Sequence, residues 1–308
     1  MSHLFRIATR ASALALWQAR HVAELLVRTD AEAVVELVEV TTAGDRVLSQ
    51  PLRQFGGQGA FTREVQTAVL EGHADLAVHS LKDLPTEPTP GLVLAAVPAR
   101  GDTDDVLVMP AGSPLTCWEQ LPQGARVGTG SPRRQAQLRA LRSDLQIHEI
   151  RGNVETRLRK LDAGEFDALV LAAAGLIRLG RESRITQRLR PPAMYHAVGQ
   201  GAIGVECRAD DRAAIDRLAA VADRATWSAV VAERSLLSTL RAGCHAPVGV
   251  ATTMTAGQLR LEAVVLSLDG SRRWFAAAER PLEEAAALGT EVAQQMLRQG
   301  ATEVLKLP

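Results

Sequence analysis

Cationic side chains follow the predicted strands of this sequence, and their positions are the first sign of chemistry. In open α/β sheets, ligands bind at the carboxyl ends of the strands, where helix N-termini already favour anions. Arginine adds bidentate recognition of carboxylates or phosphates. Five segments at predicted strand ends contain a cation, which predicts a polyanion site along one sheet edge. The cations concerned are Arg10, Lys82, Arg133, Arg134, Arg151 and Arg178.

Arginine is the usual cation of this chain, because only three of the 35 basic residues are lysine. A lone arginine on a predicted helix is therefore interpreted as a solvated surface charge. This interpretation applies to Arg139, Arg142, Arg159, Arg181 and Arg184. Arg157 lies one turn into a predicted helix, and its spacing alone leaves both interpretations open.

Asp83 is the one acid placed among these cations, in the segment His79–Asp83 that follows a predicted strand. An aspartate in such a place commonly caps a helix or forms a surface ion pair. A carboxylate at an anion site can also stabilise a cationic intermediate and pass protons. The spacing favours neither interpretation over the other.

The three cysteines, Cys117, Cys207 and Cys244, lie far apart and show no CxxC spacing. Neither a zinc site nor a disulfide framework is therefore expected. Cys244 lies between Gly243 and Pro247 in a predicted loop, where an accessible thiolate can act as a nucleophile. From these residues alone, an inert small side chain is the more common case.

Composition excludes several classes of function. The net charge is zero, which argues against a general nucleic-acid or membrane-surface binder. No apolar run is long enough to span a bilayer, and the N-terminus predicts a strand without a signal region. The seven histidines show no i, i+4 pair around an acid, and Gly56–Gly59 lacks the Gly-Lys-Ser/Thr of a phosphate loop. We therefore expect a cytoplasmic protein without metal, nucleic-acid or membrane partners.

Strands and helices alternate along the first two-thirds of the 308 residues, a length typical of two or three domains. Alternating units imply largely parallel sheets with helices on their faces. Ser12, Pro132 and Asn153 mark expected helix starts. Strands are predicted at 4–9, 34–40, 75–79, 92–97, 106–109, 126–129, 146–150 and 168–172, and helices at 132–141 and 154–161. A helix over 227–240, strands at 249–253 and 259–267 and a helix over 284–298 predict a small α+β domain.

Several longer motifs, in order along the whole chain, resemble the porphobilinogen deaminase family. They are RIATR (6–10), AVHSLKD (77–83), GTGSPRRQ (128–135), RGNVETRL (151–158), AAAGLIRLG (172–180) and AVGQGAIGVEC (197–207), followed by Gly243-Cys244 and Pro247. Ala43, Gln58 and Gly130 are among the positions that depart from the family's commonest pattern.

The resemblance implies a transferase of tetrapyrrole (haem) biosynthesis that condenses four porphobilinogen molecules head to tail into hydroxymethylbilane, with release of ammonia. A covalent dipyrromethane cofactor, bound as a thioether to the residue matching Cys244, is the primer. Asp83 matches the acid that assists deamination and stabilises cationic intermediates. The matched cofactor-binding residues are Ser80, Lys82, Thr129, Ser131, Arg133, Arg134 and Arg157. The matched substrate-binding residues are Arg10, Ser12, Gln18, Phe61, Arg151, Arg178 and Gln200.

The family fold implies an α/β protein with two periplasmic-binding-protein-like lobes, whose sheets are mixed and mostly parallel, and a small C-terminal α+β domain. The expected boundaries are 1–99 with 200–219 for lobe one, 100–199 for lobe two and 220–308 for the domain that bears the cysteine. We expect a monomer. The main alternative is a non-enzymatic two-lobed solute-binding protein for carboxylates, which leaves Cys244 and Asp83 without a role.

Overall fold

Residues 3–42, 62–243 and 246–305 are described by the computed structural model of the chain. The chain divides into two compact units. Unit 1 is Met1–Gly101 with Gly201–Trp227, and unit 2 is Asp102–Gln200 with Ser228–Pro308. The expected boundaries of the three domains stay a prediction.

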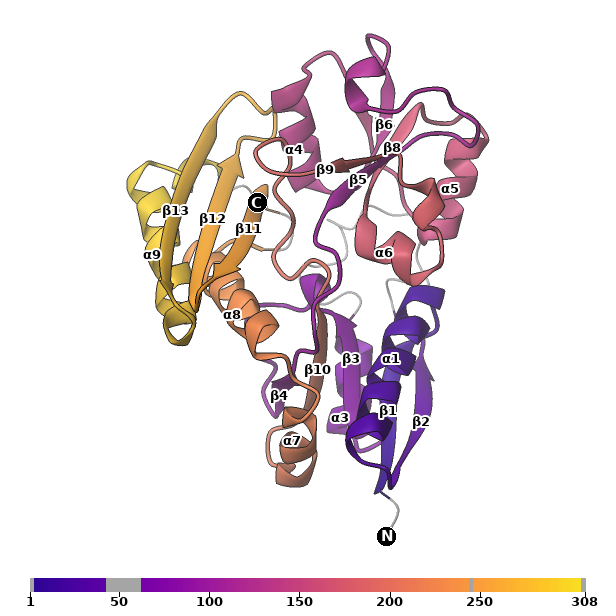
Figure 1. Ribbon diagram of the computed structural model, residues 1–308, viewed down its shortest axis with the longest axis vertical. Coiled ribbons are helices and arrows are strands. Elements are labelled where there is room, and N and C mark those ends of the chain that lie inside the picture. The colour runs from indigo at the N-terminus through magenta and orange to yellow at the C-terminus, as the bar shows by residue number, and fades with distance from the viewer. Residues whose placement is uncertain (1–2, 43–61, 244–245, 306–308) are drawn as a thin grey trace. The chain divides into compact units, whose positions relative to one another are not determined.

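Unit 1 is built on a five-stranded sheet. Its strands are β1 (His3–Arg10), β2 (Ala33–Val40), β3 (Leu76–Ser80), β4 (Leu92–Ala96) and β10 (Ile203–Arg208), in the order β2-β1-β3-β10-β4. β1 pairs in parallel with β2 and β3, whereas β10 runs antiparallel to both of its neighbours. Helices α1 (Ala13–Thr29) and α7 (Arg212–Ala219) share one apolar core with the sheet, and α3 (Arg63–Leu70) shares another (Figure 1).

Unit 2 contains a second sheet with the same plan. Its strands are β5 (Asp105–Val108), β6 (Arg126–Gly128), β7 (Gln146–His148), β8 (Ala168–Ala172) and β9 (Gln187–Leu189), in the order β7-β6-β8-β5-β9. Again three strands are parallel neighbours and one, β5, is antiparallel to both of its partners. The helices that follow its strands are α4 (Pro132–Leu141), α5 (Val154–Asp162) and α6 (Ala173–Arg178).

The remainder of unit 2 is a three-stranded antiparallel sheet of β11 (Val248–Thr255), β12 (Gln258–Leu266) and β13 (Arg273–Pro281). Helices α8 (Arg224–Thr239), α9 (Ala285–Arg298) and α10 (Thr302–Leu305) accompany it, and α8 and α9 share an apolar core with its strands. A smaller cluster packs Val264 and Leu266 of β12 against Ala136 of α4 and Tyr195. The predicted fold class, two mixed α/β lobes and a small C-terminal α+β domain, is confirmed.

The predicted helix starts are confirmed. Ser12 caps α1 by accepting from the Ala15 N–H, and Asn153 caps α5 by accepting from the Thr156 N–H. Pro132 is the first residue of α4. Its missing N–H costs nothing there, because the first helical N–H groups have no partner within the helix.

One expectation was wrong in detail. The cationic segments do not share one sheet edge, because they follow strands of two different sheets. Arg10 and the segment His79–Asp83 belong to the sheet of unit 1, whereas the segments after β6, β7 and β8 belong to unit 2. Each sheet thus has its own carboxyl edge with cations.

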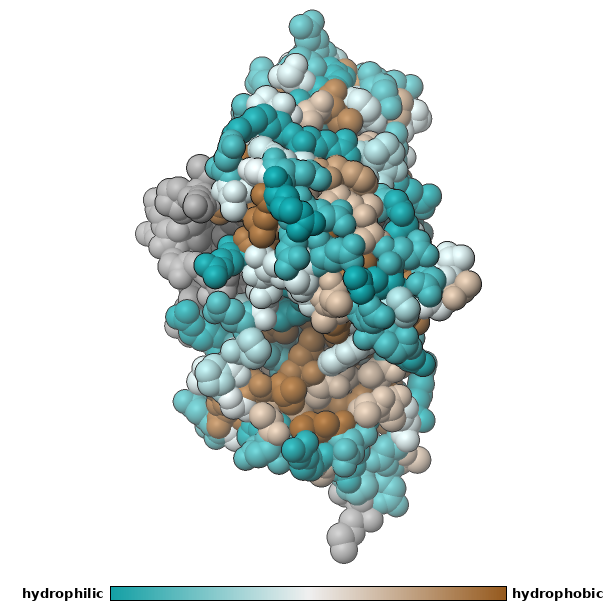
Figure 2. Space-filling model, turned by 90° about the vertical axis from the view of Figure 1, so that its left-hand side faces the viewer, coloured by the Kyte–Doolittle hydropathy of each residue, from teal (hydrophilic) through white to brown (hydrophobic). Residues whose placement is uncertain are grey.

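Hydrophilic residues cover most of the face of the molecule shown in Figure 2, with hydrophobic ones gathered in smaller areas between them. Among the residues that the structure describes, no helix has the length and apolar character that a bilayer span requires.

Helix α9 approaches α8 closely at Gly289. A Cβ atom there would lie 2.1 Å from the Ala232 carbonyl oxygen and 2.8 Å from the Leu236 nitrogen. We predict that Gly289→Ala lowers the free energy of unfolding by about 1–3 kcal/mol, because the extra methyl group forces the helices apart. Thermal unfolding measures this loss, with Ala287→Ser, at an exposed position of α9, as the control. An unchanged midpoint in Gly289→Ala would contradict the close packing.

Candidate active site

Unit 1 places four of the predicted residues at one sheet edge. Gln18 lies on the buried side of α1, and Ser80 is the last residue of β3. Gln18 Nε2 donates to Ser80 Oγ at 2.8 Å, and Ser80 Oγ donates to Gln18 Oε1 at 3.1 Å. Arg10 ends the neighbouring strand β1, and Ser12 follows it as the cap of α1. Because β1 and β3 are parallel, the four residues share the carboxyl edge of this sheet.

Lys82 and Asp83 lie in a 3-10 turn, Leu81–Asp83, directly after β3. Leu81 is buried, and its N–H donates to the Ala202 carbonyl oxygen at 3.1 Å, which fixes the start of the turn. Lys82 and Asp83 are both half-buried. In the part of the chain that the structure describes, no side-chain hydrogen bond or ion pair engages the Asp83 carboxylate.

Asp105, the first residue of β5, organises the cations of unit 2. Its carboxylate is 1% exposed and is shared by three side chains. Arg133 reaches it with both terminal nitrogens, at 2.5 and 3.3 Å, and Arg134 with Nε at 2.8 Å and Nη2 at 2.7 Å. Gln200 Nε2 donates to Oδ1 at 3.0 Å. The two guanidinium groups are themselves 4% and 6% exposed at the residue level.

The charges of this cluster favour an anion beside it. Burial alone would raise the pKa of Asp105, but Arg133 and Arg134 outweigh burial and hold that pKa well below its usual range. Burial lowers the pKa of Arg134 while Asp105 opposes the shift, and arginine stays protonated in proteins. Two cations and one anion leave one net positive charge in a largely buried space.

Arg133 Nε is buried and has no hydrogen-bond partner within the described ranges. A buried N–H without a partner destabilises the folded protein by about 1–3 kcal/mol. A ligand oxygen that accepted from Arg133 Nε would remove this penalty. The cluster therefore fits a carboxylate-bearing group.

The other cations of unit 2 lie after β7, in α5 and at the end of α6. Arg151 Nε donates to Glu149 Oε1 at 3.0 Å, and Arg157 Nε donates to the Gly152 carbonyl oxygen at 2.8 Å. Burial lowers the pKa of Arg178 to about 10. A guanidinium that has lost hydration in this way gains from a nearby anion.

Thr129 and Ser131 shape the turn that carries the arginines into α4. Thr129 is fully buried, and its hydroxyl oxygen accepts from the Ser131 N–H at 3.3 Å. Ser131 caps α4 by accepting from the Arg134 N–H at 3.5 Å. Their contacts within the protein thus orient the first helical turn, where Arg133 and Arg134 lie.

The segment before Gln200 is held from two sides. Gln137 of α4 bonds the Tyr195 backbone twice: its Oε1 accepts from the N–H at 2.7 Å and its Nε2 donates to the carbonyl oxygen at 3.0 Å. Glu233 of α8, fully buried, accepts from the Gly199 N–H at 2.8 Å and from Thr252 Oγ1 at 3.0 Å. Gln200 is therefore fixed relative to α4, α8 and β11.

Cys244 and Phe61, two of the predicted site residues, lie outside the described residues. Cys207 is fully buried in β10, and burial raises the pKa of its thiol to about 11. Its reactive thiolate form is therefore scarce at neutral pH. Cys117 is half-buried at the start of a 3-10 turn, Trp118–Gln120.

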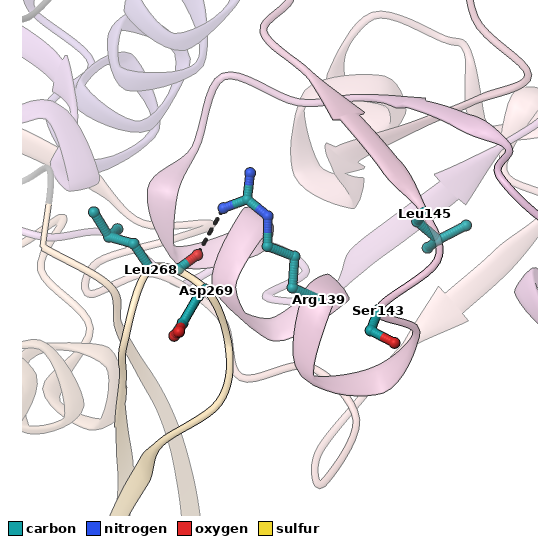
Figure 3. A pocket seen from close by; sticks show the side chains of 5 residues that line it. All are labelled: Arg139, Ser143, Leu145, Leu268 and Asp269. Atoms are coloured by element: carbon teal, nitrogen blue, oxygen red, sulfur yellow. Dashed lines mark hydrogen bonds between the residues drawn. The ribbon is translucent and has the colours of Figure 1, made fainter.

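Two pockets of unit 2 have no predicted site residue in their linings. One, of about 390 Å³, lies beside α4 and the loop between β12 and β13; Figure 3 shows its lining residues Arg139, Ser143, Leu145, Leu268 and Asp269. Arg139 Nη1 donates to the Leu268 carbonyl oxygen at 2.6 Å, so its interpretation as a solvated charge was wrong. The other, of about 510 Å³, is lined by residues within 103–104, 189–196 and 251–253 and by Glu262.

Each sheet thus presents cations at its carboxyl edge, and unit 1 adds an acid. No group of three or more His, Cys, Asp or Glu side chains that could hold a metal ion is present in the ranges 3–42, 62–243 and 246–305. The cations of each unit can bind carboxylates, and the acid of unit 1 can exchange protons.

Two family models match this chain. The model described as the dipyromethane cofactor binding domain of porphobilinogen deaminase matches residues 5–216, and that of the porphobilinogen deaminase C-terminal domain matches residues 227–298. The chain belongs to the porphobilinogen deaminase family. Porphobilinogen deaminases, also called hydroxymethylbilane synthases, join four porphobilinogen molecules on a dipyrromethane primer and release ammonia. Membership of this family favours the enzyme over the solute-binding alternative.

Solved structures resemble the chain only distantly. The VFT2 domain of BvgS from Bordetella pertussis is 14% identical, with a TM-score of 0.43, over 74% of this chain and 91% of that one. A TRAP periplasmic solute binding protein from Desulfovibrio salexigens is 11% identical, with a TM-score of 0.43, over 75% and 74%. An arginine-specific periplasmic binding protein from Salmonella typhimurium is 14% identical, with a TM-score of 0.39, over 71% and 92%. At TM-scores this low, the similarities support no conclusion about function.

The residues of a porphobilinogen deaminase that hold dipyrromethane must meet its acetate and propionate groups. The buried, partnerless Nε of Arg133 and the net positive charge around Asp105 fit such a group. Sequence reasoning missed Asp105, because an Asp at the start of a predicted strand commonly belongs to a loop. It missed Gln137 and Glu233 as well, since their partners, mostly backbone atoms, are distant in sequence.

Asp105 should govern the stability of unit 2 in a pH-dependent way. We predict that Asp105→Asn lowers the free energy of unfolding by about 3–5 kcal/mol, because two buried guanidinium groups lose their counter-ion. Since the pKa of Asp105 is lowered on folding, its contribution is full above the unfolded value of about 3.9 and is lost as the pH falls further. Urea unfolding of both proteins across this pH range measures the difference.

The control for this prediction is Asp167→Asn. Asp167 pairs with Arg126 at the surface, where an ion pair contributes about 1 kcal/mol or less. A loss in Asp105→Asn no larger than the loss in Asp167→Asn, or one that persists unchanged below about pH 3, would contradict the role given to Asp105.

Proposed function

We propose that this chain makes hydroxymethylbilane with Asp83 as its acid–base residue, Cys244 as its cofactor-bearing residue and arginines of both units as carboxylate ligands. The observation that carries the proposal is the turn Leu81–Asp83. It places a half-buried carboxylate next to Lys82 at the end of a central strand. No described side chain pairs with that carboxylate, which supports a role toward a ligand.

Carboxylate binding accounts for the cations. Each porphobilinogen brings an acetate and a propionate group, so the product gains negative charge with every addition. Guanidinium groups bind carboxylates through two parallel hydrogen bonds. In unit 2, Arg133 supplies a partnerless Nε beside Arg134, and in unit 1, Arg10 and Lys82 lie near the Gln18–Ser80 pair. The same role is proposed for Arg151, Arg157, Arg178 and Gln200, with Phe61, Ser12, Thr129 and Ser131 as neighbouring contacts.

Asp83 would act on the aminomethyl group that leaves as ammonia. In its acid form, the carboxyl group gives a proton to the departing nitrogen. The resulting carboxylate then faces the positive charge that develops on the pyrrole ring, and it takes the proton that the ring loses when the new carbon–carbon bond has formed. A fixed carboxylate stabilises such charge without reorganisation of solvent.

Dipyrromethane, when bound, supplies the pyrrole carbon to which the first substrate is added. The part of this chain is to hold it: Cys244 through a carbon–sulfur bond, and Arg133 and Arg134 through its carboxylates. Helix α8 ends at Thr239, five residues before Cys244 in the sequence, and Glu233 fixes this helix to the segment before Gln200.

We also propose that the protein is a cytoplasmic monomer. A free cysteine thiol that must form a stable thioether fits a reducing compartment. Sedimentation velocity tests the monomer, and a dimer would contradict it.

Cys244 should be the single attachment point of the cofactor. We predict that intact-mass measurement finds the dipyrrole on the wild type and on Cys207→Ala and Cys117→Ala, but not on Cys244→Ser. A thioether resists reduction, so dithiothreitol should leave the adduct in place. An adduct on Cys117, or its release by dithiothreitol, would contradict the assignment.

Asp83 should control turnover rather than stability. We predict that Asp83→Asn lowers kcat about 10²–10³-fold, because removing a preorganised charged group typically has this effect. Asp83→Glu keeps the charge and should retain part of the activity. Steady-state rates and thermal melts are measured on both variants, loaded with cofactor. A lower melting temperature with normal kcat would instead support a cap or surface ion pair.

A further inference from the structure

Glu206 is a buried carboxylate that the proposed reaction leaves without a role. Its Oε2 lies 2.9 Å from Gln66 Nε2 and 3.1 Å from His79 Nε2. The three residues are 4%, 6% and 5% exposed, and they come from β10, α3 and β3. One oxygen atom of Glu206 thus joins three elements of unit 1.

Strand geometry aims Glu206 at His79. In the antiparallel pair, His79 lies opposite Gly204, and Glu206 lies opposite Ala77. Glu206 is therefore the diagonal neighbour of His79, at a separation that long side chains can bridge. On its other side, β10 shifts register against β4 between Val205 and Glu206. Such irregularities re-aim side chains and recur beside active sites.

Gly204 leaves space for the turn that carries Asp83. A Cβ atom on Gly204 would lie 2.7 Å from Leu81 Cδ1 and 3.1 Å from Leu94 Cδ1. Leu81 therefore packs directly against the Gly204 backbone. It fills the space that a side chain at position 204, opposite His79, would occupy. Leu81 also starts the 3-10 turn Leu81–Asp83, and its N–H is bound by Ala202 just before β10. The position of β10 therefore sets the position of the turn.

Stability alone gives little reason for this cluster. Burying a carboxylate costs so much desolvation, even beside polar partners, that apolar residues of similar size often serve equally well or better. On the opposite face of β10, Cys207 packs in an apolar core with Val205 and Ile203, so an apolar solution is at hand in the same strand. What the hydrogen bond from Gln66 and the close contact with His79 add is a fixed geometry of β10 relative to α3 and β3.

We propose that Glu206 is a positioning residue, which holds His79 and Gln66 so that the Leu81–Asp83 turn keeps Asp83 in its working place. The inference rests on the proposed role of Asp83. Glu206 itself touches neither substrate nor cofactor. His79 shares this role, because it is the neighbour of Ser80 on β3 and the group through which Glu206 reaches that strand.

Glu206→Gln tests the inference with little change of shape. The amide loses the charge that strengthens both contacts. At metal sites, removing a partner that orients a ligand residue costs about 10–100-fold in activity, and we expect a loss of kcat in this range with little change in KM. His79→Gln, which alters the other partner, should show the same loss. Intact mass should find the dipyrrole on both variants.

The matched control is Cys207→Ala, at the adjacent buried position on the opposite face of β10. It should lower the melting temperature and leave kcat unchanged. Normal kcat in both Glu206→Gln and His79→Gln, whatever their melting temperatures, would overturn the inference.

A double variant separates this inference from the proposed function. If Glu206 acts through Asp83, Glu206→Gln combined with Asp83→Asn should be no slower than Asp83→Asn alone. Multiplied losses would show that Glu206 acts by another route and would overturn the inference while Asp83 keeps its role. Wild-type kcat in Asp83→Asn would overturn the proposed function itself.

Discussion

A single buried carboxylate, that of Asp105, is the constraint on which the cationic part of unit 2 depends. Two guanidinium groups could not share this space without it, because each would be a buried charge without a counter-ion. With it, Arg133 and Arg134 are held in place and unit 2 keeps an excess of one positive charge there. Gln200 joins the same carboxylate, so the segment that leads back to unit 1 is bound to the cluster as well.

Unit 1 also has a buried acid on one strand of its sheet. Each sheet has one strand that runs antiparallel to both of its neighbours, β5 or β10, called its reversed strand. In each case the chain has just crossed from the other unit when it forms this strand. Each reversed strand bears a buried acid, Asp105 or Glu206, and that acid binds side chains of a neighbouring helix and strand or loop. In unit 2 the partners are the cations themselves. In unit 1 they are Gln66 of α3 and His79 of β3, the strand that leads into the turn of Lys82 and Asp83.

The sequence predicted most of the strands and helices, because apolar periodicity and capping residues such as Ser12 and Asn153 are local signals. It did not predict β9, β10 or β13. β10 is uniformly buried and glycine-containing, and it was considered only as part of a motif. β13 alternates weakly, since alanines occupy much of its length. The sequence also could not show that the cationic segments divide between two sheets.

The site was predictable where residues act locally, and less so where they act through distant partners. Strand ends pointed to Arg10, Lys82 and Arg133 without any structure. Nothing in the spacing links Asp105 to Arg133, or Glu206 to His79, because these pairs form only when β5 and β10 enter their sheets. Buried acids on reversed strands are a product of tertiary structure, and they carry no local signature.

We infer that the buried carboxylate of Asp105 holds Arg133 and Arg134 ready for the carboxylates of a covalent cofactor. A crystal structure of the cofactor-loaded protein is the sharpest test. We expect continuous density from Cys244 Sγ to a dipyrrole, one of whose carboxylates accepts from Arg133 Nε while Asp105 still holds Arg133 and Arg134. Density for the cofactor elsewhere, or a dipyrrole whose carboxylates leave Arg133 Nε without a partner, would contradict it.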